Sequence, residues 1–188
     1  MLQPTLENRH VRLRPLRVDD WEALHAVARD PLLWEQHPSP DRWQEPVFRV
    51  FFDEALRSEG ALAIVDVATG RLIGSSRYCW HDERSGTLEI GWTFLARDRW
   101  GGETNGAVKR LMVGHALTFA TRVVFFVGLG NTRSQRALEK IGAARCANAE
   151  NRAGRPSAVY EITSASWPQV RAALPGGAET AIFGRCAS

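Results

Sequence analysis

Apolar and polar residues alternate with a period of two in several short segments, and this pattern predicts β-strands. The predicted strands span residues 10–16, 61–67, 71–80, 87–95, 143–149 and 156–163. A turn at residues 68–70 joins two of them as a hairpin. Residues 123–127 form a continuous apolar run, which is typical of a central strand buried on both faces of a sheet.

Between the strands, apolar positions recur every three to four residues, which predicts amphipathic helices. The clearest helix carries on one face Val108, Leu111, Met112, His115, Ala116 and Phe119. Further helices are expected to begin at Asp19 or Asp20, to span 42–57, to end at a C-cap at Gly142, and to span 167–174.

This order of elements predicts an α/β fold in a single domain, with a mixed central sheet of about six to seven strands flanked by helices. We assign that domain to residues 1–174. Residues 175–188 are rich in glycine and alanine with little periodicity, so we expect a poorly ordered tail there.

The composition is that of an ordinary globular protein, with 44% of the 188 residues hydrophobic and 24% charged. A formal net charge of +3 is too small to indicate a nucleic-acid partner. No apolar run reaches the length of about 18 residues that a membrane helix needs, and the first ten residues have no apolar signal core.

The three cysteines, Cys79, Cys146 and Cys186, are scattered and odd in number, which suits free thiols in a reducing compartment. We therefore expect a soluble cytoplasmic protein with no membrane partner. Neither the cysteines nor the five histidines show metal-ligand spacing, so no metal is expected. His115, in the apolar stripe of its helix, is interpreted as a core residue. The sequence leaves open whether the chain is a monomer or a homodimer.

The predicted strand 87–95 leads into Arg97-Asp-Arg-Trp-Gly-Gly-Glu-Thr-Asn-Gly106, and a long helix follows. A glycine-containing turn at a helix N-terminus presents free backbone N–H groups at the positive end of the helix dipole. The segment therefore predicts a site for a phosphate-bearing cofactor. The alternative is an ordinary turn before a helix.

Two motifs give this region a family resemblance. Arg99-Trp-Gly-Gly102-Glu-Thr104 follows the pattern Q/R-x-x-G-x-G/A, with Thr104 in place of the final Gly or Ala. Asn131-Thr-Arg-Ser134-Gln-Arg-Ala137 follows the pattern Asn-x-x-Ser-x-x-Ala. With both motifs at compatible spacing, the chain resembles the GNAT-type N-acetyltransferases, and most of all their ribosomal-protein N-terminal acetyltransferase-like (RimJ/RimL-like) branch.

The resemblance implies a GNAT-like fold that uses acetyl-CoA as cosubstrate. It implies that Thr93, Phe94 and Leu95 offer backbone groups to the pantetheine arm. It also implies that the pyrophosphate is held by the motif anchor and the amides after it, namely Arg99, Trp100, Gly101, Gly102, Glu103, Thr104 and Asn105. On the helix after the second motif, Arg133, Arg136 and Lys140 are candidates for the nucleotide phosphates, and a solvated helix face is the alternative.

Four residues are candidates for the chemistry. Glu89, on the strand before the turn, could accept a proton from an amine, or be a solvated or ion-paired strand residue. Asn131 and Ser134 could polarise or protonate the cofactor sulfur, or cap their helix. Tyr160 could face the reaction centre, or be a half-buried strand residue. We expect Glu89 on the strand face opposite Ile90, Trp92 and Phe94.

Trp34 and Trp43 lie in a proline-interrupted connection outside any clean helical period, which makes them candidates for the acceptor site. The resulting prediction is an N-acetyltransferase that moves an acetyl group from acetyl-CoA to a primary amine by direct attack. A protein N-terminus, a polyamine-like metabolite and an amino-sugar antibiotic remain open as acceptors. One alternative is a non-catalytic acyl-CoA-binding or regulatory module. The other is a nucleotide-dependent transferase, against which the chain lacks both G-x-x-x-x-G-K-[ST] and G-x-G-x-x-G.

Overall fold

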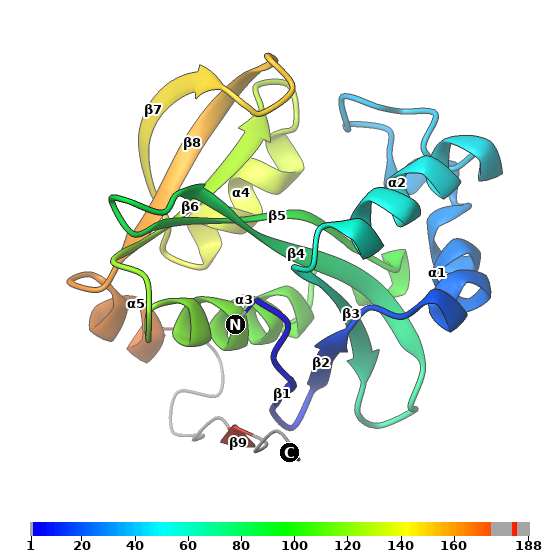
Figure 1. Cartoon of the computed structure of the whole chain (residues 1–188), viewed down its shortest axis with the longest axis horizontal. Coiled ribbons are helices and arrows are strands. Elements are labelled where there is room, and N and C mark those ends of the chain that lie inside the picture. Colours follow the sequence, from blue (N-terminus) through cyan, green and yellow to red (C-terminus); the bar gives the residue numbers. More distant parts are fainter. Residues whose placement is uncertain (1, 174–181, 184–188) are drawn as a thin grey trace.

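The computed structural model describes residues 2–173 together with 182 and 183. Within these residues one mixed sheet has the strand order β7-β8-β6-β5-β4-β3-β2-β1-β9 (Figure 1). The strands are β1 Leu6–Glu7, β2 Val11–Pro15, β3 Ala61–Asp66, β4 Leu72–Asp82, β5 Thr87–Leu95, β6 Arg122–Gly128, β7 Ala144–Glu150, β8 Pro156–Thr163 and β9 Ile182–Phe183. The helices are α1 Trp21–Ala28, α2 Glu45–Arg57, α3 Thr104–Ala116, α4 Thr132–Lys140 and α5 Trp167–Ala173.

The mixed α/β class is confirmed, and the sheet is slightly larger than expected. Nine strands replace the predicted six to seven because β1 and β9, each two residues long, extend one edge. Such short strands carry too few residues to show an alternating pattern. The tail predicted from residue 175 lies outside the described residues, apart from the two residues of β9.

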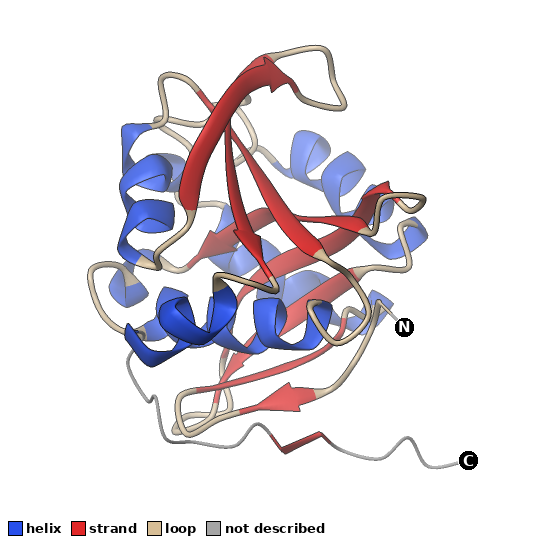
Figure 2. Cartoon of the chain, turned by 90° about the vertical axis from the view of Figure 1, so that its left-hand side faces the viewer, coloured by secondary structure: helices blue, strands red, loops and turns tan. Residues whose placement is uncertain are grey.

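Helices cover both faces of the sheet, and each face has its own apolar cluster (Figure 2). On one face, α3 packs against the strands through Val108, Leu111 and Met112. On the other face, α1 and α2 contribute an aromatic cluster around Phe48 and Phe52. The sheet therefore separates two apolar cores, and the one on the α1 and α2 side is the richer in phenylalanine and tryptophan.

Strands β5 and β6 run parallel but pair over only one end of β5. Their register joins Thr87, Leu88 and Glu89 to Arg122, Val123 and Val124, and no pairing continues beyond Glu89. On its other side β6 is paired with β8 along its whole length. The expectation that residues 123–127 form an internal strand is confirmed, and the sheet opens beside it.

A β-bulge lies where the two strands separate. Arg77 pairs with Gly91 and Ser75 pairs with Phe94, so β5 carries one extra residue there, and Trp92 has φ 52°. A bulge reverses which residues of a strand face each side. The expectation that Ile90 and Phe94 share a face is therefore wrong: Ile90 packs on the α3 side, and Phe94 packs with the aromatic cluster.

The remaining predicted elements appear with small shifts at their ends. Helix α2 begins at Glu45, later than expected, with Pro46 in its first turn, where proline is tolerated because that N–H has no helical partner. Helix α4 ends before Gly142, whose φ of 82° makes it the expected left-handed C-cap. No described helix combines the length and apolarity that crossing a membrane would require.

Candidate active site

Two adjoining cavities open where β5 leaves β6. The larger, of about 520 Å³, lies beside Glu89, and the smaller, of about 260 Å³, lies beside the glycine turn that precedes α3. Both are lined by Thr93, Asn105, Asn131 and Ser134. The two sequence motifs thus meet at the junction of the cavities, although they are far apart in the chain.

The smaller cavity contains the glycine turn. Gly101 has φ 75°, and a Cβ built on Gly101 or Gly102 would meet no protein atom within 4 Å. Helix α3 begins just after them, at Thr104, so its first N–H groups lie at this end of the cavity. The Trp100 indole N–H donates to the Leu95 carbonyl at 2.9 Å, which ties the turn to the end of β5.

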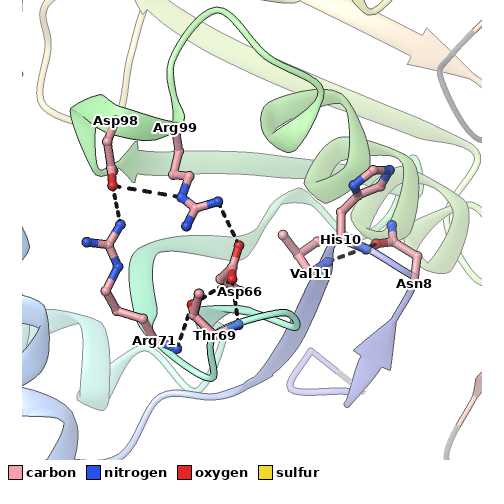
Figure 3. A network of polar contacts seen from close by, with 8 residues as sticks. All are labelled: Asn8, His10, Val11, Asp66, Thr69, Arg71, Asp98 and Arg99. Carbon is pink, nitrogen blue, oxygen red and sulfur yellow. Dashed lines mark hydrogen bonds and ion pairs between the residues drawn. The ribbon is translucent and has the colours of Figure 1, made fainter.

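The side chains of Arg99 and Glu103 are occupied by protein partners. Figure 3 shows Arg99 directed at the β3–β4 turn, where its Nη1 lies 2.9 Å from Asp66 Oδ2. Asp66 also accepts from the Thr69 N–H and hydroxyl. Glu103 Oε2 lies 3.4 Å from His10 Nε2. The Arg99 side chain therefore fixes the turn, and Glu103 and Thr104 flank the cavity at the helix start.

The basic residue that the structure brings to this cavity is Arg133. Its guanidinium lies 4.0 Å from the centroid of the Trp100 ring, and it donates to the Leu33 carbonyl at 3.1 Å. Arg136, another of the three candidates on this helix, is exposed on α4 and does not line either cavity. The sequence indicates a basic helix start, but only the packing of α4 against Trp100 selects which arginine faces inward.

Glu89 lines the larger cavity and is 5% exposed. Burial raises the pKa of its carboxyl, and a hydrogen bond from Arg152 opposes that rise. The Arg152 Nε donates to Glu89 Oε2 at 3.0 Å. Arg152 comes from the loop between β7 and β8, so the ion pair joins two distant segments. Glu89 is therefore both an ion-paired strand residue and a carboxylate at the wall of a cavity.

Asn131 and Ser134 sit at the start of α4. The Asn131 side chain accepts from the Ser134 N–H at 3.0 Å, so its capping role is present in the structure. The Ser134 side chain is half-buried at the junction of the two cavities. Its hydroxyl is not needed for the cap, because the cap uses its backbone N–H.

Lys109 is a cavity residue that sequence reasoning missed. It is 4% exposed on α3, its Nζ donates to Thr93 Oγ1 at 2.8 Å, and it lies 5.5 Å from the Phe125 ring centroid. Burial lowers its pKa to about 7. A lysine among apolar helix positions looks like a solvated residue in sequence, and only the gap between β5 and β6 shows where it points.

Two other predicted residues lie away from the cavities. Tyr160 is a strand residue, as in the alternative interpretation, but it is fully buried in the α3-side core and not half-buried, and its hydroxyl donates to Glu139 at 2.9 Å. Trp43 is 40% exposed and lines neither cavity. Trp34 lines both, but its indole N–H donates to the Ala28 carbonyl at 2.7 Å, so the tryptophan is also part of the core.

Comparison with known proteins identifies the family. A family model described as "Acetyltransferase (GNAT) domain" matches residues 10–144, more than half of the chain. The chain belongs to the GNAT acetyltransferase family. The family predicted from the two motifs is therefore confirmed.

Solved structures of GNAT proteins share this fold. A protein assigned as an acetyltransferase from T. thermophilus is 31% identical, with 92% of this chain and 95% of that chain covered and a TM-score of 0.74. Mycobacterium smegmatis RimJ in complex with CoA-disulfide is 21% identical over 88% of each chain, with a TM-score of 0.62.

A protein assigned as a ribosomal-protein-serine acetyltransferase from Vibrio cholerae is 16% identical, with 86% of this chain and 99% of that chain covered and a TM-score of 0.69. At these lower identities, the RimJ and Vibrio cholerae structures are evidence of shared fold. No curated protein matches this chain.

Proposed function

We propose that this GNAT protein is an N-acetyltransferase that moves an acetyl group from acetyl-CoA directly to a primary amine. The observation that carries the proposal is the junction of the two cavities. The glycine turn lies at one end, Glu89 lies at the other, and Ser134 lies between them.

The glycine turn fits a pyrophosphate. The positions around Gly101 and Gly102 face open space, and the first N–H groups of α3 have no carbonyl partner within the helix. Hydrogen bonds from such groups to an anion are each worth about 1.5–3 kcal/mol. Beyond the turn, the unpaired edge of β5 from Gly91 to Leu95 leaves backbone groups available toward β6 for an extended pantetheine arm. Acetyl-CoA would supply a thioester whose acetyl group an amine can accept.

Glu89 is our candidate for the proton acceptor. An alkyl ammonium has a pKa of about 10.4 and must lose a proton before it can attack. A carboxylate with a raised pKa is a better base than a solvated one, and burial raises the pKa of Glu89. Arg152 holds the side chain in one orientation, so the amine proton would pass to a carboxylate oxygen directly or through one water.

Ser134 is our candidate for the proton donor to the departing sulfur. A thiol of this kind has a pKa of about 8.5, so a proton helps it leave without being obligatory. The Ser134 hydroxyl lies at the cavity junction, and the Asn131 cap fixes the backbone that carries it. Tyr160 is a poorer donor because its hydroxyl is already engaged with Glu139.

Direct transfer is favoured over an acetyl-enzyme. Of the cysteines in the described part of the chain, Cys146 is exposed on β7, and the partial burial of its thiol raises the pKa of that thiol. Cys79 is half-buried on β4, and neither cysteine lines a cavity. A nucleophilic cysteine needs a lowered pKa and access to the substrate.

The acceptor class remains to be found, and a panel of amines tests the proposal. Protein N-terminal peptides, polyamines, amino sugars and amino acids would each be incubated with acetyl-CoA, and free thiol and acetylated product would be measured. We expect amine-dependent thiol release with a matching acetylated product. If acetyl-CoA binds and no amine is acetylated, the protein is an acyl-CoA-binding module instead.

A further inference from the structure

We infer that the acceptor end of the larger cavity binds an anionic group, so that the acceptor is a primary amine that also carries a carboxylate. This inference rests on the proposed function and narrows its substrate class. It follows from a surplus of hydrogen-bond donors and positive charge on the α2 side of the sheet, next to Glu89.

Arg77 is the first part of that surplus. It is 6% exposed, and its Nε and Nη2 have no hydrogen-bond partner among the described residues. Its guanidinium lies 4.7 Å from the centroid of the Trp92 ring, which lines the cavity, and 5.6 Å from that of Phe51. Buried guanidinium groups are normally paired, because an unpaired buried charge is costly. An anion bound nearby would supply the missing acceptors.

Arg42 also packs on the Phe51 ring, and it lines the cavity. Its guanidinium is 4.5 Å from the centroid of the Phe51 ring and 5.2 Å from that of Trp34. Burial lowers the pKa of Arg42 to about 10; the charges of Arg155 and Arg77 act in the same direction, and those of Glu54 and Asp41 oppose it. Arg42 lines the cavity and Arg77 does not, but both guanidinium groups lie near the Phe51 ring, so an anion bound beside Arg42 would favour the charged form of both.

His37 adds a second, independent sign of missing acceptors. Its Nδ1 lies 2.9 Å from the Ser39 N–H donor, and its Nε2 lies 3.1 Å from Arg42 Nη1. Burial lowers the His37 pKa to about 4, so the ring is neutral at physiological pH. A neutral imidazole has one acceptor nitrogen, so it cannot accept from both donors. Either the Ser39 N–H or an N–H of Arg42 Nη1 therefore has no acceptor on His37 and is available to a ligand.

The protein's own carboxylates do not remove the surplus. Glu89 is engaged by Arg152. Glu54, which also lines the cavity, is exposed on α2, and its charge favours the charged form of Arg42 and Arg77 without forming an ion pair with either. Among the described residues, no carboxylate lies within ion-pair distance of Arg42 or Arg77. Arg155, which also lines the cavity, donates to the Pro38 carbonyl and the Ser39 hydroxyl.

The positions of these groups set the spacing of the ligand. Arg77 pairs with Gly91 and Cys79 pairs with Glu89, so Arg77 and Glu89 are diagonal neighbours on adjacent strands. The backbone positions of such neighbours are about 7–8 Å apart, so side chains from both can reach one small ligand. One small molecule can therefore place its amine at Glu89 and its carboxylate toward Arg77 and Arg42. Trp34, Trp92 and Phe126 line the walls between them and favour an apolar or aromatic body.

Matched pairs of amines test the inference. L-phenylalanine is compared with phenethylamine, and L-tryptophan with tryptamine, because the members of each pair differ only in the carboxylate. The amidated dipeptides Ala-Asp and Ala-Asn form a third pair, which distinguishes an acidic side chain near a peptide N-terminus from a free amino acid. For each pair the ratio of kcat/KM, acid-bearing amine over neutral amine, is measured with saturating acetyl-CoA.

We expect at least one ratio to exceed about tenfold, since charge-assisted hydrogen bonds of about 1.5–3 kcal/mol would be formed only with the acid. That ratio should fall toward one in Arg77→Gln and in Arg42→Gln. Arg49→Gln is the matched control, because Arg49 also stacks on an aromatic ring, that of Trp21, but is exposed and outside the cavity. It should keep the wild-type ratio.

Ratios near or below one for every pair in the wild type would overturn the inference and leave the proposed function standing. The inference is likewise overturned, and the proposed function kept, if both arginine variants fold and keep the wild-type ratio. Binding of acetyl-CoA without acetylation of any amine would instead overturn the proposed function, and the inference with it.

Discussion

Burial and a neighbouring arginine act in opposite directions on the carboxyl of Glu89. Removal from water favours the protonated form, while the Arg152 guanidinium favours the carboxylate. The net effect is a raised pKa, so the carboxylate is a stronger base than a solvated one. Glu89 is thus the single residue on which the proposed chemistry depends most.

Replacing Glu89 by Gln should lower kcat by at least about tenfold, because general base catalysis is typically worth 10²–10⁴-fold. Acetyl-CoA affinity should stay near normal, since the glycine turn is unchanged. Steady-state kinetics and calorimetry measure the two effects. Glu161→Gln is the control, because Glu161 is also ion-paired with an arginine, Arg122, but lies outside both cavities. A Glu89→Gln enzyme with wild-type kcat at every pH would assign the base to water or another residue.

The pH dependence of activity should respond to Arg152. As the proposed base, Glu89 would act when deprotonated, so we expect kcat/KM to fall as the pH drops through its pKa. In Arg152→Gln the influence that lowers this pKa is lost, and the pKa rises further. The acidic limb of the kcat/KM profile should therefore move to higher pH. If the acidic limb stays in place or moves to lower pH, the ionisation that controls this limb is not that of Glu89.

At the scale of elements, helix α3 follows an open glycine turn and carries the buried Lys109 further along. The turn is held by its neighbours: Arg99 binds the β3–β4 turn, and Trp100 binds the end of β5. Its glycines are left facing the cavity. A side chain added there should affect a ligand more than the fold.

Gly102→Val tests this directly. Gly102 does not have positive φ, and its added Cβ would meet no protein atom within 4 Å, so the variant should fold. The valine would occupy the space where the backbone must approach a phosphate, and acetyl-CoA binding should weaken by at least about tenfold, or 1.4 kcal/mol. Gly130→Val, at a position equally open but outside the turn, is the control. Unchanged affinity measured by calorimetry in folded Gly102→Val would place the phosphates elsewhere.

Lys109 should make folding stability depend on pH. Its pKa falls from 10.5 in the unfolded chain to about 7 in the fold, so protonation costs about 1.4 kcal/mol for each unit of that difference. The cost is absent above the unfolded pKa, grows as the pH falls, and is complete below the folded pKa.

In Lys109→Met the free energy of unfolding should exceed that of the wild type at neutral pH, because methionine fills the same space without a charge. The gain should shrink as the pH rises from about 7 toward 10.5. Urea unfolding across that range measures it. A difference between the two proteins that does not vary with pH would mean that Lys109 is solvated in the folded state.

At the scale of the molecule, β6 serves both the core and the cavity. Val123 is fully buried on the α3 side, whereas Val127 is half-buried and lines the larger cavity. The continuous apolar run alone predicts that a charge at Val127 unfolds the domain. Because the sheet opens beside β6, we expect the unfolding effect at Val123 instead. The Val123 side chain is fully enclosed, whereas that of Val127 is not.

Val123→Asp should therefore prevent folding, since a buried unpaired charge costs several kcal/mol. Val127→Asp should fold and lose activity. Circular dichroism and NMR dispersion of the two variants check this. A well-folded Val123→Asp protein would mean that β6 is peripheral.

The sequence predicted most of the elements because periods of two and 3.6, together with Gly and Pro, report local structure directly. The two motifs came from the family resemblance, which the family model confirms. It missed features that depend on neighbours distant in the chain. The bulge at Trp92 arises from pairing with β4, and the Arg99–Asp66 pair joins a turn to another hairpin. The inward direction of Lys109 likewise depends on the separation of β5 from β6. The arginines around the proposed acceptor site come from three distant segments: Arg42 from the loop before α2, Arg77 from β4, and Arg155 from the loop between β7 and β8. No sequence motif links these segments.

The central claim is direct transfer within a cavity that holds acetyl-CoA and the amine together. The most direct test is an initial-rate grid in which acetyl-CoA and the best amine of the panel are both varied. We predict double-reciprocal lines that intersect, because both substrates must be bound before the acetyl group moves. Parallel lines, with a stable acetyl-enzyme detected by mass spectrometry in the absence of amine, would contradict the account.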